Sequence, residues 1–238
     1  MRAQRVSAFA LTSAGLEVHA GRVQIARHRH EHAYAALILQ GGYEESGSQG
    51  RYRVCAGEVL LHRCFDAHLD RFTAAGARIL NLLLPADPPL AYGCVADPDT
   101  IARLAERDPL AASGALMQQL RALPAAGADW PDLLAQELRR EPQLRLSEWA
   151  QRHGLAAATL SRGFRKVFAI GPAQFRAEAR VQRALALVRH SAVPLARIAA
   201  EAGFADQAHM TRALGALTGR CPGHWRRSNK FKTASARD

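Results

Sequence analysis

The pattern of apolar and polar positions along the chain changes near residue 95. Before that point, short alternating or wholly apolar segments are separated by turn-forming residues. Alternation with a period of two is typical of half-buried strands, and short strands at intervals of roughly ten residues indicate a sandwich or small barrel. The predicted strands are Leu16–Ile25, Tyr34–Leu39, Tyr52–Val54, Val59–His62 and Arg78–Leu84. Turns are expected at Gly41-Gly42, Ser46-Gly47-Ser48 and Ala75-Gly76.

From Asp97 onward the apolar residues recur at helical spacing. They are Ile101, Leu104, Ala105, Leu110, Leu116, Leu120 and Leu123. This pattern predicts helices within residues 96–128, followed by a linker at Pro124–Ala128. Residues 129 to about 228 are expected to be helical again, since proline and glycine stand where helices should begin or end. These residues are Pro131, Pro142, Gly154, Pro172, Pro194, Gly203 and Pro222.

The second half contains a degenerate repeat. Trp149-Ala150 and Gly154-Leu155 correspond to Ile198-Ala199 and Gly203-Phe204, at an offset of 49 residues. After the turn the offset becomes 50 residues. The correspondence then continues through the pairs Leu160/Met210, Arg162/Arg212, Phe164/Leu214, Pro172/Pro222, Phe175/Trp225 and Arg176/Arg226.

Each copy has the layout of a helix-turn-helix. A small residue (Ala150 or Ala199) lets a second helix cross the first closely, and the following glycine (Gly154 or Gly203) permits a left-handed turn. The next helix then supplies a recognition surface. Asp206 is expected to cap the second of these helices. One copy alone would fit any small helical bundle equally well, whereas two copies in register favour DNA binding.

The segment between the copies predicts one unbroken helix over Pro172–His190. Its apolar stripe consists of Val181, Ala184, Leu185 and Val188. Such a helix is about 28 Å long, whereas successive major-groove faces on one side of B-DNA lie about 34 Å apart. One chain can therefore present two recognition helices to adjacent grooves.

Charge sharpens this interpretation. The chain has 238 residues and a net charge of +11. Residues 1–128 carry 13 Lys/Arg against 12 Asp/Glu, a net of +1, and residues 129–238 carry 19 against 9, a net of +10. This asymmetry indicates a polyanion bound by the second half.

Two other patterns bear on the compartment. No apolar run approaches the ~18 residues that cross a bilayer, and the N-terminal run Val6–Leu11 is too short for a signal peptide. The scattered cysteines Cys55, Cys64, Cys94 and Cys221 form no zinc-finger or disulfide spacing. A cytoplasmic protein with reduced thiols, without a membrane partner, is expected.

Residues 129–228 resemble the DNA-binding domain of the AraC family of bacterial transcription regulators. The most diagnostic part is Ile198-Ala199-x3-Gly203-Phe204-x-Asp206-x3-Met210-x-Arg212-x-Leu214-x4-Gly219-x2-Pro222-x2-Trp225-Arg226. Arg180-Val-Gln-Arg183-Ala184-x2-Leu187-Val188 also matches the family pattern. The chain departs from the pattern at several positions. The family usually has aromatic residues at Met210 and Leu214, glycine at Ala169, and serine or threonine at Gly171 and Cys221.

The resemblance implies the DNA-facing residues. On the second recognition helix these are Gln207, His209, Thr211 and Arg212, with Arg suited to guanine, Gln to adenine and the Thr methyl to thymine. Arg212 would alternatively clamp a phosphate. The first recognition helix begins with Ala156-Ala157-Ala158 and lacks a side-chain cap, so it is expected to read fewer bases, through Ser161 and Arg162. Arg165, Lys166, Arg176 and Arg226 are expected to be phosphate contacts or solvated charges.

In the first 95 residues, His28, His30 and His32 alternate, which places them on one face of a strand, and Gly41, Gly57 and His68 follow. In this pattern the first 95 residues resemble a cupin, a domain that often precedes the DNA-binding domain in this family. An effector pocket is expected at His30, His32, Tyr34 and His68. A divalent metal on His30, His32 and His68 is a second option, although the glutamate of a catalytic cupin set is missing. Metal-free effector sensing, with no cofactor, is the default expectation.

The expected fold is therefore α+β, with a cupin-like β-sandwich or barrel at residues 1–95. Residues 96–128 are a helical linker that makes dimer contacts or else covers the sheet of its own domain, and residues 129–230 are an AraC-type domain with two helix-turn-helix motifs. The expected function is transcription regulation without catalysis. The partners would be double-stranded promoter DNA, a small effector, RNA polymerase and a second copy of the chain. The alternatives are a metal-dependent cupin, as enzyme or metal sensor, with a basic helical domain, and a DNA binder that senses no effector.

Overall fold

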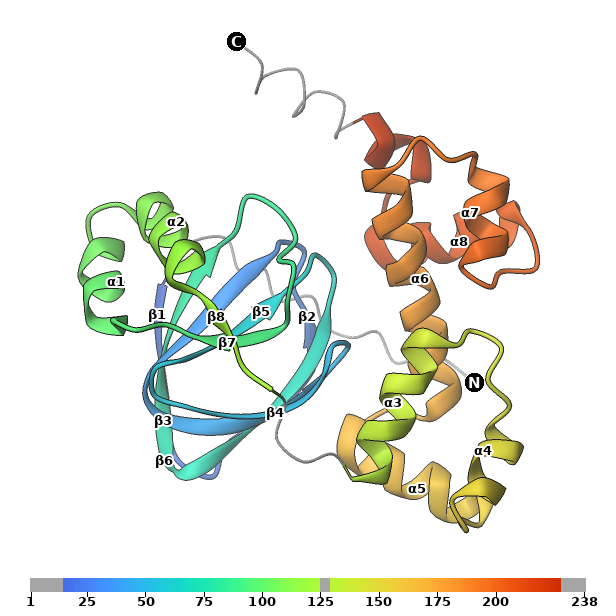
Figure 1. Ribbon diagram of the computed structural model, residues 1–238, viewed down its shortest axis with the longest axis horizontal. Coiled ribbons are helices and arrows are strands. Elements are labelled where there is room, and N and C mark those ends of the chain that lie inside the picture. The colour runs from blue at the N-terminus through green and yellow to red at the C-terminus, as the bar shows by residue number, and fades with distance from the viewer. Residues whose placement is uncertain (1–14, 125–128, 228–238) are drawn as a thin grey trace. The chain divides into compact units, whose positions relative to one another are not determined.

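A computed structural model describes residues 15–124 and 129–227. The expected linker residues 125–128 and the N-terminal apolar run lie outside the described residues. The chain is α+β, with an antiparallel sheet followed by a helical unit (Figure 1). Contacts within the chain divide it into two compact units: one comprises the residues up to Asp132 together with Val167–Ala169, and the other comprises Leu133–Lys166 and the residues from Ile170 onward. The exact domain boundaries stay predictions.

Two long strands organise the sheet. β3 (Tyr34–Gly47) and β6 (Ala67–Leu83) pair with each other along most of their length. Through its C-terminal half β6 also pairs with β1 (Gly15–His19), and through its N-terminal half with β2 (Gln24–Arg29). Each long strand therefore has one neighbour along its N-terminal half and another along its C-terminal half.

The remaining strands pair with one half of β3 or lie beyond β5. The N-terminal half of β3 pairs with β5 (Glu58–His62), and its C-terminal half pairs with β4 (Gly50–Cys55) through a tight connection at Ser48-Gln49. β7 (Tyr92–Cys94) and β8 (Arg121–Ala122) extend the sheet beyond β5. β8 lies in a segment for which only helices were predicted.

Glycines bend the long strands where turns were predicted. Gly41 and Gly76 have φ of +73° and +69°, and a Cβ on Gly41 would lie 2.0 Å from the Gly76 carbonyl oxygen. The β3–β6 register shifts at this point. The turn predictions at Gly41-Gly42 and Ala75-Gly76 were therefore wrong, because glycine here permits a bulge and a close backbone approach without ending the strand. The predicted strand Leu16–Ile25 is likewise two strands, β1 and β2.

The sheet packs on both faces. One cluster of buried side chains lies between the two halves of the curved sheet: Tyr34, Ala36, Ile38, Tyr43, Val54, Leu60, Phe72, Ala77 and Ile79. The other face carries Ala35, Leu37, Val59, Leu61, Leu80, Leu82 and Val95. This second face is covered by α1 (Pro98–Ala105) and α2 (Pro109–Gln119), which contribute Ile101, Ala112 and Leu116 (Figure 1). The apolar stripes of these helices thus cover the sheet of their own unit, and dimer contacts through them stay a prediction.

The second unit is helical. Its elements are α3 (Trp130–Arg140), α4 (Leu146–Arg152), α5 (Ala157–Phe168), α6 (Pro172–His190), α7 (Leu195–Glu201) and α8 (Gln207–Thr218), and residues 222–227 are also helical. The prediction for α6 is confirmed at both ends, and Val181, Ala184, Leu185 and Val188 are buried. Among the described helices, none has the length and apolar content needed to span a bilayer.

Candidate functional site: a duplicated helix-turn-helix and a pocket in the sheet

The two helix-turn-helix motifs have the same backbone design. α4 ends at a turn in which Gly154 has φ of +64°, and α7 ends at a turn in which Gly203 has φ of +81°. In the first turn the Leu155 amide donates to the Ala150 carbonyl at 2.9 Å, and in the second the Phe204 amide donates to the Ala199 carbonyl at the same distance. The expected glycine turns are confirmed in both copies.

Equivalent side chains form the core of each motif. Trp149 and Ile198 are fully buried on the first helices, α4 and α7. On the second helices, Leu160 and Phe164 of α5 correspond to Met210 and Leu214 of α8, and all four are at most 3% exposed. Met210 and Leu214 point inward as predicted, so the aliphatic and thioether side chains fill positions that are usually aromatic in the family.

Two arginines stabilise the motifs from within. Arg176 donates to the Leu144 carbonyl at 2.8 Å, just before α4, and Arg226 donates to the Val193 carbonyl at 2.6 Å, just before α7. Both guanidinium groups belong to half-buried residues. Neither guanidinium is therefore simply solvated, because each satisfies a carbonyl ahead of the first helix of its own motif, and a phosphate contact by either arginine stays a prediction.

The N-terminal ends of the second helices differ. The Asp206 side chain accepts a hydrogen bond from the His209 amide at 2.6 Å, which confirms the predicted cap of α8. The equivalent residue before α5 is Ala156, whose methyl group can accept no hydrogen bond. The two recognition helices are thus anchored unequally.

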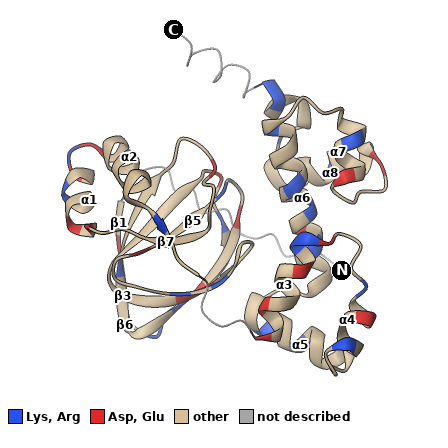
Figure 2. Cartoon of the chain, in the orientation of Figure 1, with Lys and Arg blue, Asp and Glu red and all other residues tan. Residues whose placement is uncertain are grey.

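The residues expected to face DNA lie on the outer faces of α5 and α8. Ser161, Arg162 and Arg165 are exposed on α5. On α8, Gln207, His209 and Arg212 are exposed and Thr211 is half-buried. The His209 ring packs edge-on against Phe204, with ring centroids 5.3 Å apart. Lys and Arg residues recur along α6 and around both motifs (Figure 2). The roles of the DNA-facing residues stay predictions.

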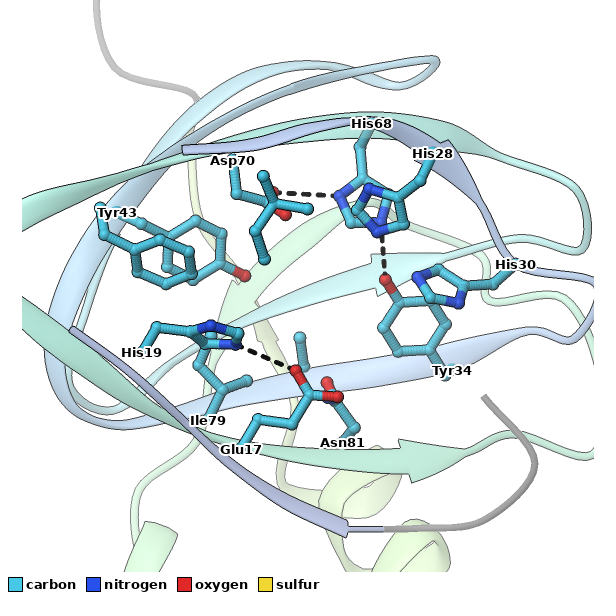
Figure 3. A pocket seen from close by; sticks show the side chains of 13 residues that line it. Glu17, His19, His28, His30, Tyr34, Tyr43, His68, Asp70, Ile79 and Asn81 are labelled. Carbon is cyan, nitrogen blue, oxygen red and sulfur yellow. Dashed lines mark hydrogen bonds and ion pairs between the residues drawn. The ribbon is translucent and has the colours of Figure 1, made fainter. Parts of the chain in front are cut away.

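The sheet contains a cavity of about 360 Å³. Its apolar wall is formed by Ile25, Ala36, Tyr43, Phe72 and Ile79, and its polar wall by Glu17, His19, His28, His30, Tyr34, His68, Asp70 and Asn81 (Figure 3). A ligand would therefore meet an apolar surface on one side and several hydrogen-bonding groups on the other. Such a combination is typical of sites for small organic molecules.

Three of the four predicted pocket residues meet in this cavity. His30, Tyr34 and His68 line it, and the Tyr34 hydroxyl lies 2.9 Å from His68 Nε2. His32 does not line it, because β2 ends at Arg29 and His32 lies in an exposed bend. The expectation that His28, His30 and His32 share one strand face was therefore wrong for His32.

The buried groups at the polar wall favour their neutral forms. Burial raises the pKa of the Asp70 carboxyl to about 7, and its Oδ1 lies 3.0 Å from His68 Nδ1. Burial also lowers the pKa of His68 and raises that of Tyr34 well above its usual value. Elsewhere on the lining, His19 Nε2 lies 3.0 Å from Glu17 Oε2, and the His19 ring stacks on Phe72 (Figure 3).

Sequence reasoning missed part of this wall. Asp70 and Phe72 follow His68 at intervals of two along β6, so strict alternation could have placed them on the same face. Glu17 and His19 stand at the same interval on β1. Their approach to the β6 residues depends on the β1–β6 register, which a single sequence does not reveal.

The family comparison concerns the second unit. Residues 149–228 match the family model described as "Helix-turn-helix domain". This match covers both motifs, from the buried Trp149 to the helical residues after Pro222. Residues 149–228 form a helix-turn-helix domain of the AraC type. None of the curated protein sequences compared with the chain matches it.

Several solved structures are similar to the chain. ToxT from Vibrio cholerae is 9% identical, with a TM-score of 0.38, over 90% of this chain and 98% of that one. A probable AraC family transcriptional regulator from Rhodopseudomonas palustris is 15% identical, with a TM-score of 0.37, over 40% of this chain and 93% of that one. The C-terminal domain of AraT, a response regulator from Geobacillus stearothermophilus, is 20% identical, with a TM-score of 0.40, over 44% and 88%.

One departure of the AraC-type domain has a structural consequence. Ala169, where the family usually has glycine, has φ of +61°, and Gly219 at the equivalent position of the second copy has φ of +69°. A side chain in this left-handed region is strained, so the first motif keeps its geometry at a cost of about 1–2 kcal/mol.

Proposed function

We propose that the chain is a cytoplasmic transcription regulator that binds duplex promoter DNA in a sequence-specific manner and has no catalytic activity of its own. The observation that carries the proposal is the pair of equivalent motifs, each with a buried inner face and an exposed polar outer face on α5 or α8. Exposed Arg and Gln side chains on such helices are suited to base edges in the major groove.

The two copies support recognition of one extended site. α6 joins them with 19 residues, a length of about 28 Å, which suits adjacent major grooves on one face of the duplex. Because α8 is capped and offers four polar candidates, and α5 is uncapped, the second copy would supply most of the base specificity. Contacts from the basic residues to phosphates would supply a salt-dependent share of the affinity.

DNA selection tests this function directly. The full-length chain is incubated with a random duplex library, bound sequences are enriched, and the selected site is checked by footprinting at several salt concentrations. The expected result is a site with two protected segments about 10 base pairs apart, and affinity that falls as salt rises. Equal affinity for all duplexes, or a preference for single-stranded RNA, would contradict the proposal.

The sheet cavity is the proposed effector site. Its mixed apolar and polar lining, with His30, Tyr34 and His68 at the polar wall, suits a small organic molecule. A metabolite panel screened by thermal shift should yield a compound that stabilises the wild-type chain and changes its DNA affinity. Ala36→Leu, which fills the cavity, should abolish both effects, and Ala105→Leu on α1 serves as the matched control. A constitutive DNA binder would show no compound with both effects.

Contacts with RNA polymerase and homodimer formation remain predictions of the family resemblance. Light scattering of the purified chain at several concentrations measures the oligomeric state. A mass of one chain at all concentrations would contradict the dimer.

A further inference from the structure

A second polar cluster lies inside the sheet, behind the wall of the cavity. Glu45 of β3, His62 of β5 and His68 of β6 come from three strands, and each is at most 5% exposed. One ligand-type atom from each side chain lies within 4.8 Å of the others. Such a grouping of buried polar side chains requires partners, because leaving a polar group unpaired in the interior is costly.

The contacts within this cluster are not hydrogen bonds. Glu45 Oε2 lies 3.4 Å from His62 Nε2 and 3.4 Å from His68 Nδ1. Both Glu45 Oε2 and His62 Nε2 are buried without a hydrogen-bond partner among the described residues. The carboxyl oxygen and the imidazole nitrogen are therefore neighbours that form no hydrogen bond with each other.

These separations fit atoms that share a metal ion. Zinc binds imidazole nitrogen and carboxylate oxygen at about 2.0–2.2 Å, so two ligands in a tetrahedral arrangement lie about 3.4 Å apart. Both Glu45 contacts have this length. Two histidines and one carboxylate are also a recurrent ligand set for zinc and for ferrous iron.

We propose that Glu45, His62 and His68 bind a divalent transition-metal ion of the zinc or ferrous-iron class. The ligand atoms are Glu45 Oε2, His62 Nε2 and His68 Nδ1. Asp70 Oδ1 lies 3.0 Å from His68 Nδ1, at hydrogen-bonding distance, so binding of the ion to Nδ1 replaces this hydrogen bond. Because His68 also lines the cavity, the ion can reach the site from the cavity side.

Neighbouring groups orient the ligands as in other metal sites. The Tyr34 hydroxyl lies 2.9 Å from His68 Nε2, and the Tyr34 ring stacks on His62 with centroids 4.3 Å apart and an angle of 13°. With the ion on Nδ1, the Nε2–H group of His68 donates to the Tyr34 hydroxyl oxygen. An outer hydrogen bond of this kind fixes the ring orientation of a metal-binding histidine.

This site differs from the histidine group predicted from the sequence. His28, His30 and His68 also lie within 4.8 Å of one another, but they face the cavity. His68 belongs to both groups, so a His68 variant cannot separate them. Glu45 and His62 belong only to the proposed site, and His28 and His30 only to the other group.

Metal titration of the untagged full-length chain tests the proposal. The chain is treated with a chelator, dialysed and titrated with Zn²⁺ and, as a spectroscopic probe, with Co²⁺. The wild-type chain should take up one equivalent and rise in melting temperature. The Co²⁺ derivative should show visible d–d absorption of a nitrogen and oxygen ligand set, without thiolate charge transfer. No uptake, or a thiolate signature, overturns the proposal.

Four variants locate the ion. Glu45→Gln and His62→Gln should each weaken Zn²⁺ binding by about 100-fold or more, because loss of a ligand exceeds the effect of losing an outer hydrogen bond. His28→Gln and His30→Gln are the matched controls and should bind as the wild type does. The reverse pattern places the ion at the cavity and overturns the assignment. If Glu45→Gln or His62→Gln does not fold, X-ray absorption of the wild-type Zn²⁺ form decides, with two histidines supporting the site and three overturning it.

Discussion

Ala169 and Gly219 hold the same left-handed backbone conformation at equivalent positions of the two motifs, with φ of +61° and +69°. Only one of the two residues is suited to it, because a Cβ disfavours this region and glycine does not. A Cβ on Gly219 would meet no atom within 4 Å, so the cost of a side chain there is conformational. The two motifs therefore allow the backbone strain of an alanine and of a glycine to be compared at the same position.

Exchange of these residues should move stability in opposite directions. Ala169→Gly relieves strain but enlarges the unfolded ensemble, for a net gain of about 0.5–1 kcal/mol in the free energy of unfolding. Gly219→Ala should lose about 1 kcal/mol. Urea denaturation of the two variants measures both changes. A loss for Ala169→Gly would show that the alanine methyl group makes stabilising contacts that outweigh the strain.

The unequal caps give a second matched pair. Asp206→Ala removes the acceptor of the His209 amide and should lower the stability by about 1 kcal/mol. Ala156→Asp supplies the missing acceptor at the start of α5 and should raise the stability by a similar amount. Thermal melts of both variants check this, with Ala156→Asn as the control that supplies a capping oxygen without the charge. Destabilisation by Ala156→Asp would mean that residue 156 does not occupy a capping conformation.

The two recognition helices should differ in base specificity. Arg212→Ala is expected to weaken binding to the selected site by about 1–3 kcal/mol and to relax the preference at one base pair. Arg162→Ala should have the same kind of effect if the first motif reads a base. Competition gel shifts against single-base variants of the site measure this, and Arg107→Ala on the loop after α1 controls for the lost charge. A uniform loss on all sequences would make either arginine a phosphate contact.

Arg176 and Arg226 should affect folding more than DNA binding. Each donates to a carbonyl that precedes the first helix of its motif, and a hydrogen bond from a charged group contributes about 1.5–3 kcal/mol. Arg226→Ala should lower the stability by this amount, yet leave the salt dependence of DNA affinity unchanged. A salt slope reduced by about 1 would reveal a phosphate contact in addition. Arg176→Ala repeats the test in the first motif.

The helices over the sheet provide a prediction about packing. Leu116 of α2 is fully buried against the sheet, whereas Leu110 at the start of the same helix is 71% exposed. Leu116→Ala should cost about 2–5 kcal/mol of stability, and Leu110→Ala less than about 0.5 kcal/mol. Denaturation of both variants tests this. If Leu110→Ala also destabilises in a concentration-dependent manner, this leucine lies in a homodimer interface.

Local sequence signals were sufficient for the helical unit. Pro172 starts α6 and its apolar stripe runs to His190, and Gly154, Gly203 and Asp206 mark turns and a cap by their own backbone preferences. The repeat was readable because equivalent positions keep an offset of 49 residues up to the turn and 50 residues after it. What the sequence left open here was the direction of long side chains: Arg176 and Arg226 look like surface charges until their carbonyl partners, about 30 residues earlier, are known.

The sheet was decided by tertiary structure. Gly41 and Gly76 carry the same signal for a bulge as for a turn, and only the pairing of β3 with β6 distinguishes them. His32 appears in the alternating pattern of the sequence but lies outside the cavity, whereas Glu45 and His62, which carry no motif, meet His68 from separate strands. The physical reason is that helical structure depends on residues three or four apart in the chain. The interior of a sheet brings together residues that are far apart in the chain, and strand register decides which of them meet.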